Sequence, residues 1–271
     1  MKITGLLFMF AVAAAFGQDA QPDRVTVPFS DPSRPKMLKA SLINGGITVR
    51  GYEGKDAIVE ARPEGRRKRD RGDREANGMK RIDMAGTGLT VEESDNVITV
   101  GTRSVNDNIE VVIQVPFNTS LKLHAVNGGD IVVDHITGDV EINNTNGNAT
   151  ATHISGVAVV HALNGKVLVS MDKVTSDKPM SFSSLNGDID VTLPTDVKAR
   201  VKLKSDNGAI YSDFDVTIDA NSRKPVVLEN NSGKGKYRVQ FDKTMYGLIN
   251  GGGPEMQFTT FNGNVYIRKV K

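Results

Sequence analysis

The sequence contains neither cysteine nor tryptophan, and aromatic residues make up only 6% of its 271 residues. The absence of cysteine excludes a disulfide framework, a thiolate metal site and a cysteine nucleophile. A surplus of one charge is also missing. The net charge is +2, which argues against a dedicated nucleic-acid-binding protein. A chain of this length can bury a sizeable core, so its stability must come from packing and backbone pairing.

The N-terminal sequence MKITGLLFMFAVAAAFGQDAQ predicts export. Lys2 supplies a positive start, residues 3–16 are uncharged and apolar, and Ala15-Phe16-Gly17 offers small residues where a signal peptidase cleaves. The apolar run is shorter than the ~20 residues that span a bilayer. We therefore expect a signal peptide over residues 1–17 and a mature chain without a transmembrane segment. We expect that mature chain to be periplasmic, on the cell surface or secreted.

A turn signature, a small polar residue followed by glycine, recurs along the chain. Asn and Gly both accept a positive φ cheaply, so each pair indicates a change of chain direction. Five consecutive pairs start 10, 9, 9 and 9 residues apart. They start at Asn127, Thr137, Asn146, Ser155 and Asn164, and other Asn-Gly pairs start at Asn44, Asn186, Asn207, Asn250 and Asn262.

Apolar residues keep a fixed register with these turns. Leu163 precedes Asn164, and Val167 and Val169 follow it at alternate positions. The same offsets recur as Leu185, Ile189 and Val191, as Ile43, Ile47 and Val49, and as Phe261, Val265 and Ile267. Alternation predicts strands with one buried face, so we expect Leu163 and its equivalents to point inward with the valines. The mature chain shows no convincing helical period, and the sequence predicts an all-β protein.

Nine-residue units fit two architectures. In an antiparallel meander, each Asn-Gly pair would form a hairpin turn. In a solenoid, two units form one coil and equivalent positions stack. HITG at 135–138 recurs 18 residues later as HISG, and HAVNG at 124–128 recurs 37 residues later as HALNG. Stacked coils explain a repeat at every second turn, so we predict a parallel β-helix-like or stacked-sheet β-solenoid with coils of about 18–22 residues.

The predicted layout places a lead-in segment over residues 18–36, with a first strand at 24–29, after the signal peptide. An irregular β region follows over 37–104. The regular solenoid covers 105–271 and is continuous with the preceding region as one domain. Because solenoid ends expose unpaired strand edges, we expect the charged C-terminal segment YIRKVK to blunt one end.

Three stretches of the chain resemble the bacterial putative-adhesin family. They are the LNGxIxV repeats, the segment SFSSLNGDIDVTLP at 181–194 and the C-terminal INGGGPEMQFTTFNGNVYIRKVK. The resemblance extends from about Leu38 to the end of the chain. It implies an exported β-strand-repeat protein of unknown function with a solenoid fold and a cell-envelope location, and it supplies no catalytic residues.

Residues 62–81 break the repeat. They contain nine Lys or Arg residues, four Asp or Glu residues and almost no apolar side chain. Such a run cannot offset the entropy of ordering it, so we expect a solvated insertion. The alternative is an electrostatic arm for anionic lipid, lipopolysaccharide or acidic polysaccharide. Its candidate binding residues are Arg66, Arg67, Lys68, Arg69 and Arg71.

Two further groups could carry chemistry. In an 18-residue coil, His135 and His153 would stack at the ~4.8 Å spacing of adjacent strands, and Asp134 or Asp139 could add a carboxylate for a metal ion. Polar ladders are ordinary in solenoids, however, so we predict no metal site and no cofactor. His124 and His161 lie two coils apart, with Asn143 between them, and form no contiguous pair.

Asp188 and Asp190 could suggest the paired carboxylates of a glycoside hydrolase. They flank Ile189, so both should lie on the solvent side of one strand, but no tryptophan platform accompanies them. We predict a non-enzymatic envelope or surface protein, an adhesin or scaffold that binds through a polar β face. The expected partners are envelope polysaccharide, an anionic lipid surface or another envelope protein, and not nucleic acid. The alternatives are a carbohydrate-active lyase or hydrolase on a β-helix and an envelope-stress or signalling partner protein.

Overall fold

The computed structural model describes residues 23–63, 87–102, 108–174, 178–219, 225–231, 236–241 and 243–271. Every regular element in these ranges is a β-strand, which confirms the prediction of an all-β chain. Within the same ranges, no helix is long and apolar enough to cross a membrane. The expected signal peptide lies outside them.

Twenty-one strands follow one another along the chain. They are β1 Asp23–Val27, β2 Lys36–Tyr52, β3 Ala57–Pro63, β4 Leu89–Ser94, β5 Val97–Thr102, β6 Ile109–Pro116, β7 Thr119–Ile136, β8 Val140–Asn146, β9 Ala149–Ile154, β10 Ala158–Ala162, β11 Val167–Met171, β12 Met180–Asn186, β13 Ile189–Leu193, β14 Ala199–Asn207, β15 Ile210–Ser212, β16 Val216–Ile218, β17 Pro225–Asn231, β18 Lys236–Phe241, β19 Met245–Ile249, β20 Glu255–Asn262 and β21 Val265–Lys269.

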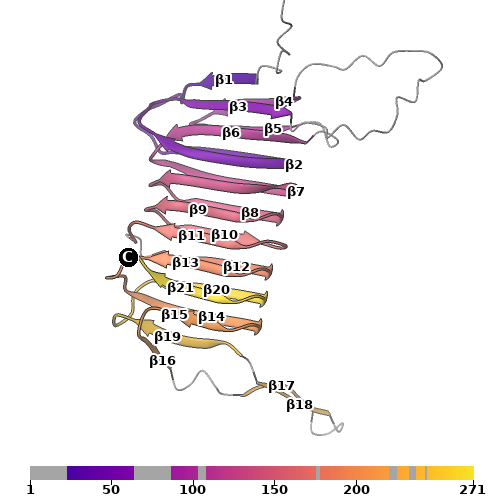
Figure 1. The fold of residues 1–271 in the computed structure, drawn as a ribbon, viewed down its shortest axis with the longest axis vertical. Coiled ribbons are helices and arrows are strands. Elements are labelled where there is room, and N and C mark those ends of the chain that lie inside the picture. The colour runs from indigo at the N-terminus through magenta and orange to yellow at the C-terminus, as the bar shows by residue number, and fades with distance from the viewer. Residues whose placement is uncertain are drawn as a thin grey trace, which may run out of the picture.

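The central strands stack in parallel along two faces of the elongated molecule (Figure 1). On what we call the β8 face, the first half of β7 is followed by β8, β10, β12, β20 and β14. On the β9 face, the second half of β7 is followed by β9, β11, β13, β21 and β15. The prediction of a solenoid-like fold is therefore confirmed, and the meander is excluded.

The chain advances 18, 19 or 22 residues between paired positions from β7 to β13. Examples are the pairs Ile131–Ala149, Leu121–Val140 and Val160–Phe182. His124, Asn143 and His161 share one register position, as the repeat predicts.

Antiparallel strands cover both ends of the parallel stack. At one end, β3 pairs with β6 and β1 pairs with β3, while β4 pairs with β5. At the other end, β19 pairs with β14 and β16 pairs with β19. An antiparallel strand at the end of a parallel stack changes the pattern that a further coil would have to match, and it thereby limits end-to-end association.

The C-terminal coil does not lie at an end, which corrects the expectation that YIRKVK blunts one. β20 lies between β12 and β14, and β21 lies between β13 and β15 (Figure 1). Asn262 therefore contacts Asn186, 76 residues before it, on one side and Asn207, 55 residues before it, on the other. The last strands to be synthesised become an interior layer of the stack.

Apolar side chains fill the space between the two faces. Val167 and Val169 are fully buried, and the rings of Phe182 and Phe258 pack with their centroids 5.2 Å apart. The prediction that Leu163 points inward is wrong, because its equivalents Leu185 and Phe261 are 41% and 45% exposed. The buried residue on that strand is Ala162, so the strict alternation of a strand turns Leu163 outward.

The Asn-Gly corners depend on close stacking rather than on a positive φ at every glycine. Gly128 has a φ of +83°, but Gly165 and Gly187 do not have positive φ values. A Cβ on Gly165 would lie 2.0 Å from the carbonyl oxygen of Gly147, the equivalent glycine of the preceding coil. Real Cβ atoms do not approach an oxygen so closely, so a side chain at Gly165 would force neighbouring coils apart.

The asparagines of the corners form a hydrogen-bonded ladder along the stack. Each donates its side-chain amide to the side-chain oxygen of a neighbour. The bonds run from Asn146 to Asn127 (3.1 Å), Asn164 to Asn146 (2.9 Å), Asn186 to Asn164 (2.8 Å), Asn262 to Asn186 (2.8 Å) and Asn207 to Asn262 (3.0 Å). The recurring Asn thus fixes the register between coils.

We expect the substitution Asn164→Ala to lower the free energy of unfolding by about 1–2 kcal/mol, because it removes two ladder bonds. Chemical denaturation followed by circular dichroism measures the change. Asn143→Ala is the matched control, because its amide donates only to Glu141 of its own strand, at 3.2 Å. Equal destabilisation by the two substitutions would contradict a stabilising role for the ladder.

Candidate binding sites on the solenoid-like surface

His135 and His153 meet at the corners that follow the β9 face. Asp134 pairs with Thr152 and Ile136 pairs with Ile154, so the two histidines lie opposite each other on successive coils. Both have left-handed backbones, with φ values of 57° and 53°. Their rings stack with centroids 4.3 Å apart and planes 20° apart, which confirms the predicted stacking.

Asp134 holds both imidazoles. Its Oδ2 lies 2.8 Å from Nδ1 of His135 and its Oδ1 lies 2.8 Å from Nδ1 of His153, while the Thr152 hydroxyl donates to Oδ1 at 2.8 Å. Desolvation raises the pKa of Asp134, but hydrogen bonds from His153, Thr152 and His135 outweigh it and lower the pKa to about 2. The hydrogen bond to Asp134 in turn raises the pKa of His153, and the charge of Asp172 adds to this effect.

Asp139, the other carboxylate considered for this cluster, lies elsewhere. It forms an ion pair with Lys178 at 2.9 Å and accepts a hydrogen bond from the Val157 amide at 3.3 Å. The remaining histidines are on the β8 face, where His161 Nδ1 lies 2.8 Å from the Ser183 hydroxyl. Of the four histidines, only His135 and His153 share a carboxylate among the printed contacts of the described chain.

Asp188 and Asp190 do not converge on a common cleft. Asp188 accepts a hydrogen bond from the Asn264 amide at 2.8 Å, and this contact belongs to the stacking of the corners. Asp190 accepts one from Arg268 Nε at 2.7 Å. The two carboxylates thus have separate partners, which is not the arrangement that glycoside hydrolysis requires.

Arg268 and Asp190 belong to an aromatic cluster that sequence reasoning missed. Tyr211 and Tyr266 stack with ring centroids 5.2 Å apart and planes 9° apart. The Arg268 guanidinium lies 5.1 Å from the centroid of Tyr266. Asp190 pairs with Tyr266, and Tyr266 pairs with Tyr211, so three coils contribute to one patch of the β9 face. The signal in the sequence was the recurrence of the Asn-Gly corner, which aligns Asp190 with Tyr266 once the coil order is known.

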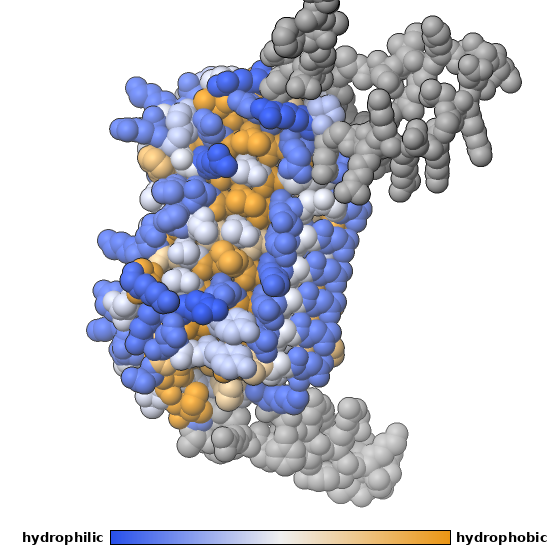
Figure 2. Space-filling model, viewed as in Figure 1, coloured by the Kyte–Doolittle hydropathy of each residue, from blue (hydrophilic) through white to orange (hydrophobic). Residues whose placement is uncertain are grey.

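The molecular surface combines apolar and hydrophilic side chains along its length. Figure 2 shows an apolar band that runs along the visible face between hydrophilic flanks. Exposed apolar residues on the β9 face include Leu168 and Tyr211. Such a mixed surface offers both apolar contact and hydrogen bonds to a partner.

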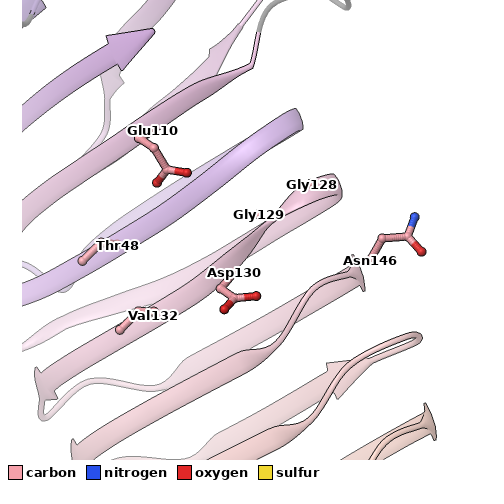
Figure 3. Close-up of a pocket in the computed structure, with 7 residues that line it drawn as sticks. All are labelled: Thr48, Glu110, Gly128, Gly129, Asp130, Val132 and Asn146. Carbon is pink, nitrogen blue, oxygen red and sulfur yellow. The ribbon is translucent and has the colours of Figure 1, made fainter. Parts of the chain in front are cut away.

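An open pocket lies beside the corner of β7 (Figure 3). Gly128 and Gly129 form its floor without side chains, and the carboxylates of Glu110 and Asp130 lie beside them. Asp130 also accepts hydrogen bonds from the Asn148 amide at 2.7 Å and from its side chain at 3.2 Å. Asp130 thus serves the stacking of coils as well as lining the pocket.

The candidate electrostatic arm lies outside the described residues. Arg66, Arg67, Lys68, Arg69 and Arg71 all fall between Pro63, where β3 ends, and residue 87. Its binding role remains a prediction from the sequence.

Comparisons with known proteins agree with the repeat. Residues 120–243 match the family described as Toastrack DUF4097. A putative cell adhesion protein from Clostridium sporogenes is 13% identical over 92% of this chain and 100% of that chain, with a TM-score of 0.43. Putative adhesins from Bacteroides fragilis and Parabacteroides distasonis are 10% and 9% identical over 93% of this chain and 98% of each of those chains, with TM-scores of 0.28 and 0.25. No curated protein matches. The predicted resemblance to the bacterial putative-adhesin family is confirmed.

Proposed function

We propose that this Toastrack-containing chain is an exported, non-enzymatic protein of the cell envelope or surface that binds polysaccharide through its β9 face. Export rests on the predicted signal peptide. On this proposal the scaffold is a parallel β-helix-like rod, which holds side chains from successive coils at fixed spacing. The observation that carries the proposal is the exposed cluster of Tyr211, Tyr266, Arg268 and Asp190.

The cluster combines the chemistry that sugars require. One face of the Tyr211 ring packs on Tyr266, but the residue is 54% exposed, because among the described strands β15 pairs only with β21. An exposed aromatic ring buries apolar surface with little loss of side-chain freedom. Arg268 and Asp190 add donors and acceptors for hydroxyl groups beside it.

Positioning of these groups favours binding over chemistry. The ion pair between Arg268 and Asp190 and the stack between the two tyrosines hold the side chains in place before a ligand arrives. Preorganisation of this kind reduces the entropy lost on binding. The partner that fits best is an acidic or neutral envelope polysaccharide, because Arg268 supplies a charged donor and Tyr211 an apolar surface.

We expect Tyr211→Ala to weaken binding of the mature chain to envelope polysaccharide by roughly tenfold, which corresponds to the loss of one aromatic contact of about 1.4 kcal/mol. Binding is measured by co-sedimentation with purified polysaccharide and by biolayer interferometry. Tyr246→Ala is the matched control, because Tyr246 is an exposed tyrosine on β19, next to β14 of the β8 face.

A variant without residues 63–80 separates the face from the predicted arm. Loss of binding in that variant, with wild-type binding by Tyr211→Ala, would assign the interaction to the arm and refute the proposal. Absence of binding by the wild-type chain would refute it as well.

A further inference from the structure

We propose that Asp134, His135 and His153 form a binding site for a divalent transition-metal ion of the zinc class. This proposal is independent of the polysaccharide site, which lies on other residues of the β9 face. It also goes beyond the sequence-based expectation of no metal site, because the sequence shows the stacking of two histidines but not the position of the carboxylate between them.

Three ligand atoms converge in this cluster. One ring nitrogen from each histidine and a carboxylate oxygen of Asp134 all lie within 4.8 Å of one another. Imidazole nitrogens and carboxylate oxygens are common zinc ligands, with bond lengths of about 2.0–2.2 Å. Rotation of the two imidazoles would close the remaining distance, and the exposure of their side chains, 54% for His135 and 50% for His153, permits it.

The backbone directs both imidazoles to the same place. His135 and His153 adopt left-handed conformations that non-glycine residues seldom occupy. Strain of this kind persists only where the surrounding structure imposes it, and it is concentrated at functional sites. Here each corner holds one such residue between two paired positions, so the same orientation recurs on successive coils.

Neighbouring coils do not extend the histidine ladder. In β2, Arg50 pairs with Asp134 and is followed by Gly51. In β11, Met171 pairs with Ile154, and the residue after it is Asp172. The cluster is therefore limited to two imidazoles and one carboxylate, flanked by one cation and one further anion.

The ligand set favours a borderline metal ion over calcium or magnesium. Two nitrogen ligands suit Zn²⁺, Cu²⁺ and Ni²⁺, whereas calcium and magnesium prefer oxygen ligands alone. Three protein ligands leave room for water as a fourth ligand of a tetrahedral ion. The alternative is a hydrogen-bonded pair of imidazoles on Asp134 that binds no metal ion.

Isothermal titration of the tag-free mature chain with Zn²⁺ tests the proposal. We expect saturable uptake of one ion per chain, weakened by about tenfold or more in His135→Ala, His153→Ala and Asp134→Asn. The double variant His124→Ala/His161→Ala removes the same number of imidazoles as the two ligand substitutions together and should bind as tightly as the wild-type chain. Binding to the folded state should also raise the thermal midpoint of the wild-type chain and of the double variant.

Two results would overturn the proposal. The first is no saturable uptake of Zn²⁺ by the wild-type chain. The second is uptake that the ligand variants retain or that the control variant loses equally. Circular dichroism of each variant before titration identifies any loss of fold, and in that case Asp134→Asn, which keeps the shape of the side chain, decides the outcome.

Discussion

Deletion of residues 255–271 should destabilise the protein as severely as removing the centre of its core, although the segment is C-terminal. β20 and β21 each pair with strands on both sides. Their inward side chains Met256, Phe258, Val265 and Ile267 are all at most 1% exposed. Each buried side chain of this size stabilises a fold by about 1.5–3 kcal/mol, so the loss is roughly 6–12 kcal/mol, comparable with the entire stability of a domain.

Urea denaturation of the truncated chain, followed by circular dichroism, measures this loss. The variant Phe258→Ala serves as the comparison, since it keeps the backbone of the coil and should lower the free energy of unfolding by only about 3–5 kcal/mol. A synthetic peptide of residues 250–271, added in trans, should restore part of the stability.

Wild-type stability of the truncated chain would contradict the prediction. It would mean that β14 and β15 stack directly on β12 and β13, which their repeats would allow. Hydrogen exchange distinguishes the two cases, because direct stacking would preserve the protection of β14 amides in the truncated chain.

The position of β20 and β21 was beyond prediction from the repeat. Asn262 forms the same side-chain hydrogen bond with Asn186 and with Asn207 as the other corner asparagines form with theirs. A repeat therefore specifies which positions stack, but it does not specify which coil lies next to which. The order depends on the path of the chain through β19, which turns back antiparallel to β14 and so brings the last coil alongside it.

The pattern of alternation failed at one position for a related reason. The sequence places Leu163 at an even offset from Val167, but the corner lies between them and restarts the alternation on the other face. Counting from Ala162 within its own strand would have turned Leu163 outward. The spacing of 18 residues did predict the stacked histidines, since that inference required only two successive coils.

The candidate sites divide along the same line. The cluster of Asp134, His135 and His153 was accessible in part, because its residues lie on adjacent coils in chain order. The patch of Tyr211, Tyr266 and Asp190 was not, because the inserted coil brings Tyr266 next to an aspartate that lies 76 residues before it. Local repeats predict local neighbours, and the insertion creates the others.

The substitution Gly165→Ala should lower the free energy of unfolding by about 3 kcal/mol or more, which is unusual for the addition of one methyl group. The new Cβ would lie 2.0 Å from the Gly147 carbonyl oxygen and 2.5 Å from its carbon. Both atoms belong to the backbone, so no side chain can rotate away. Relief requires the two coils to separate at the corner, where Asn164 donates to Asn146 and the Ser184 hydroxyl donates to the Gly165 carbonyl.

Gly101→Ala is the matched control, because it adds the same methyl group to a strand of the same stack. The nearest atom to a Cβ at Gly101 is the Ser41 carbonyl oxygen at 3.7 Å, an ordinary contact distance. Neither glycine has a positive φ, so backbone conformation does not distinguish them. The change at Gly101 should stay within about 1 kcal/mol of the wild-type stability, since alanine restricts the unfolded chain. If the two variants unfold at the same urea concentration, close stacking of glycines does not explain why glycine recurs at the corners, and their recurrence must reflect turn conformation alone.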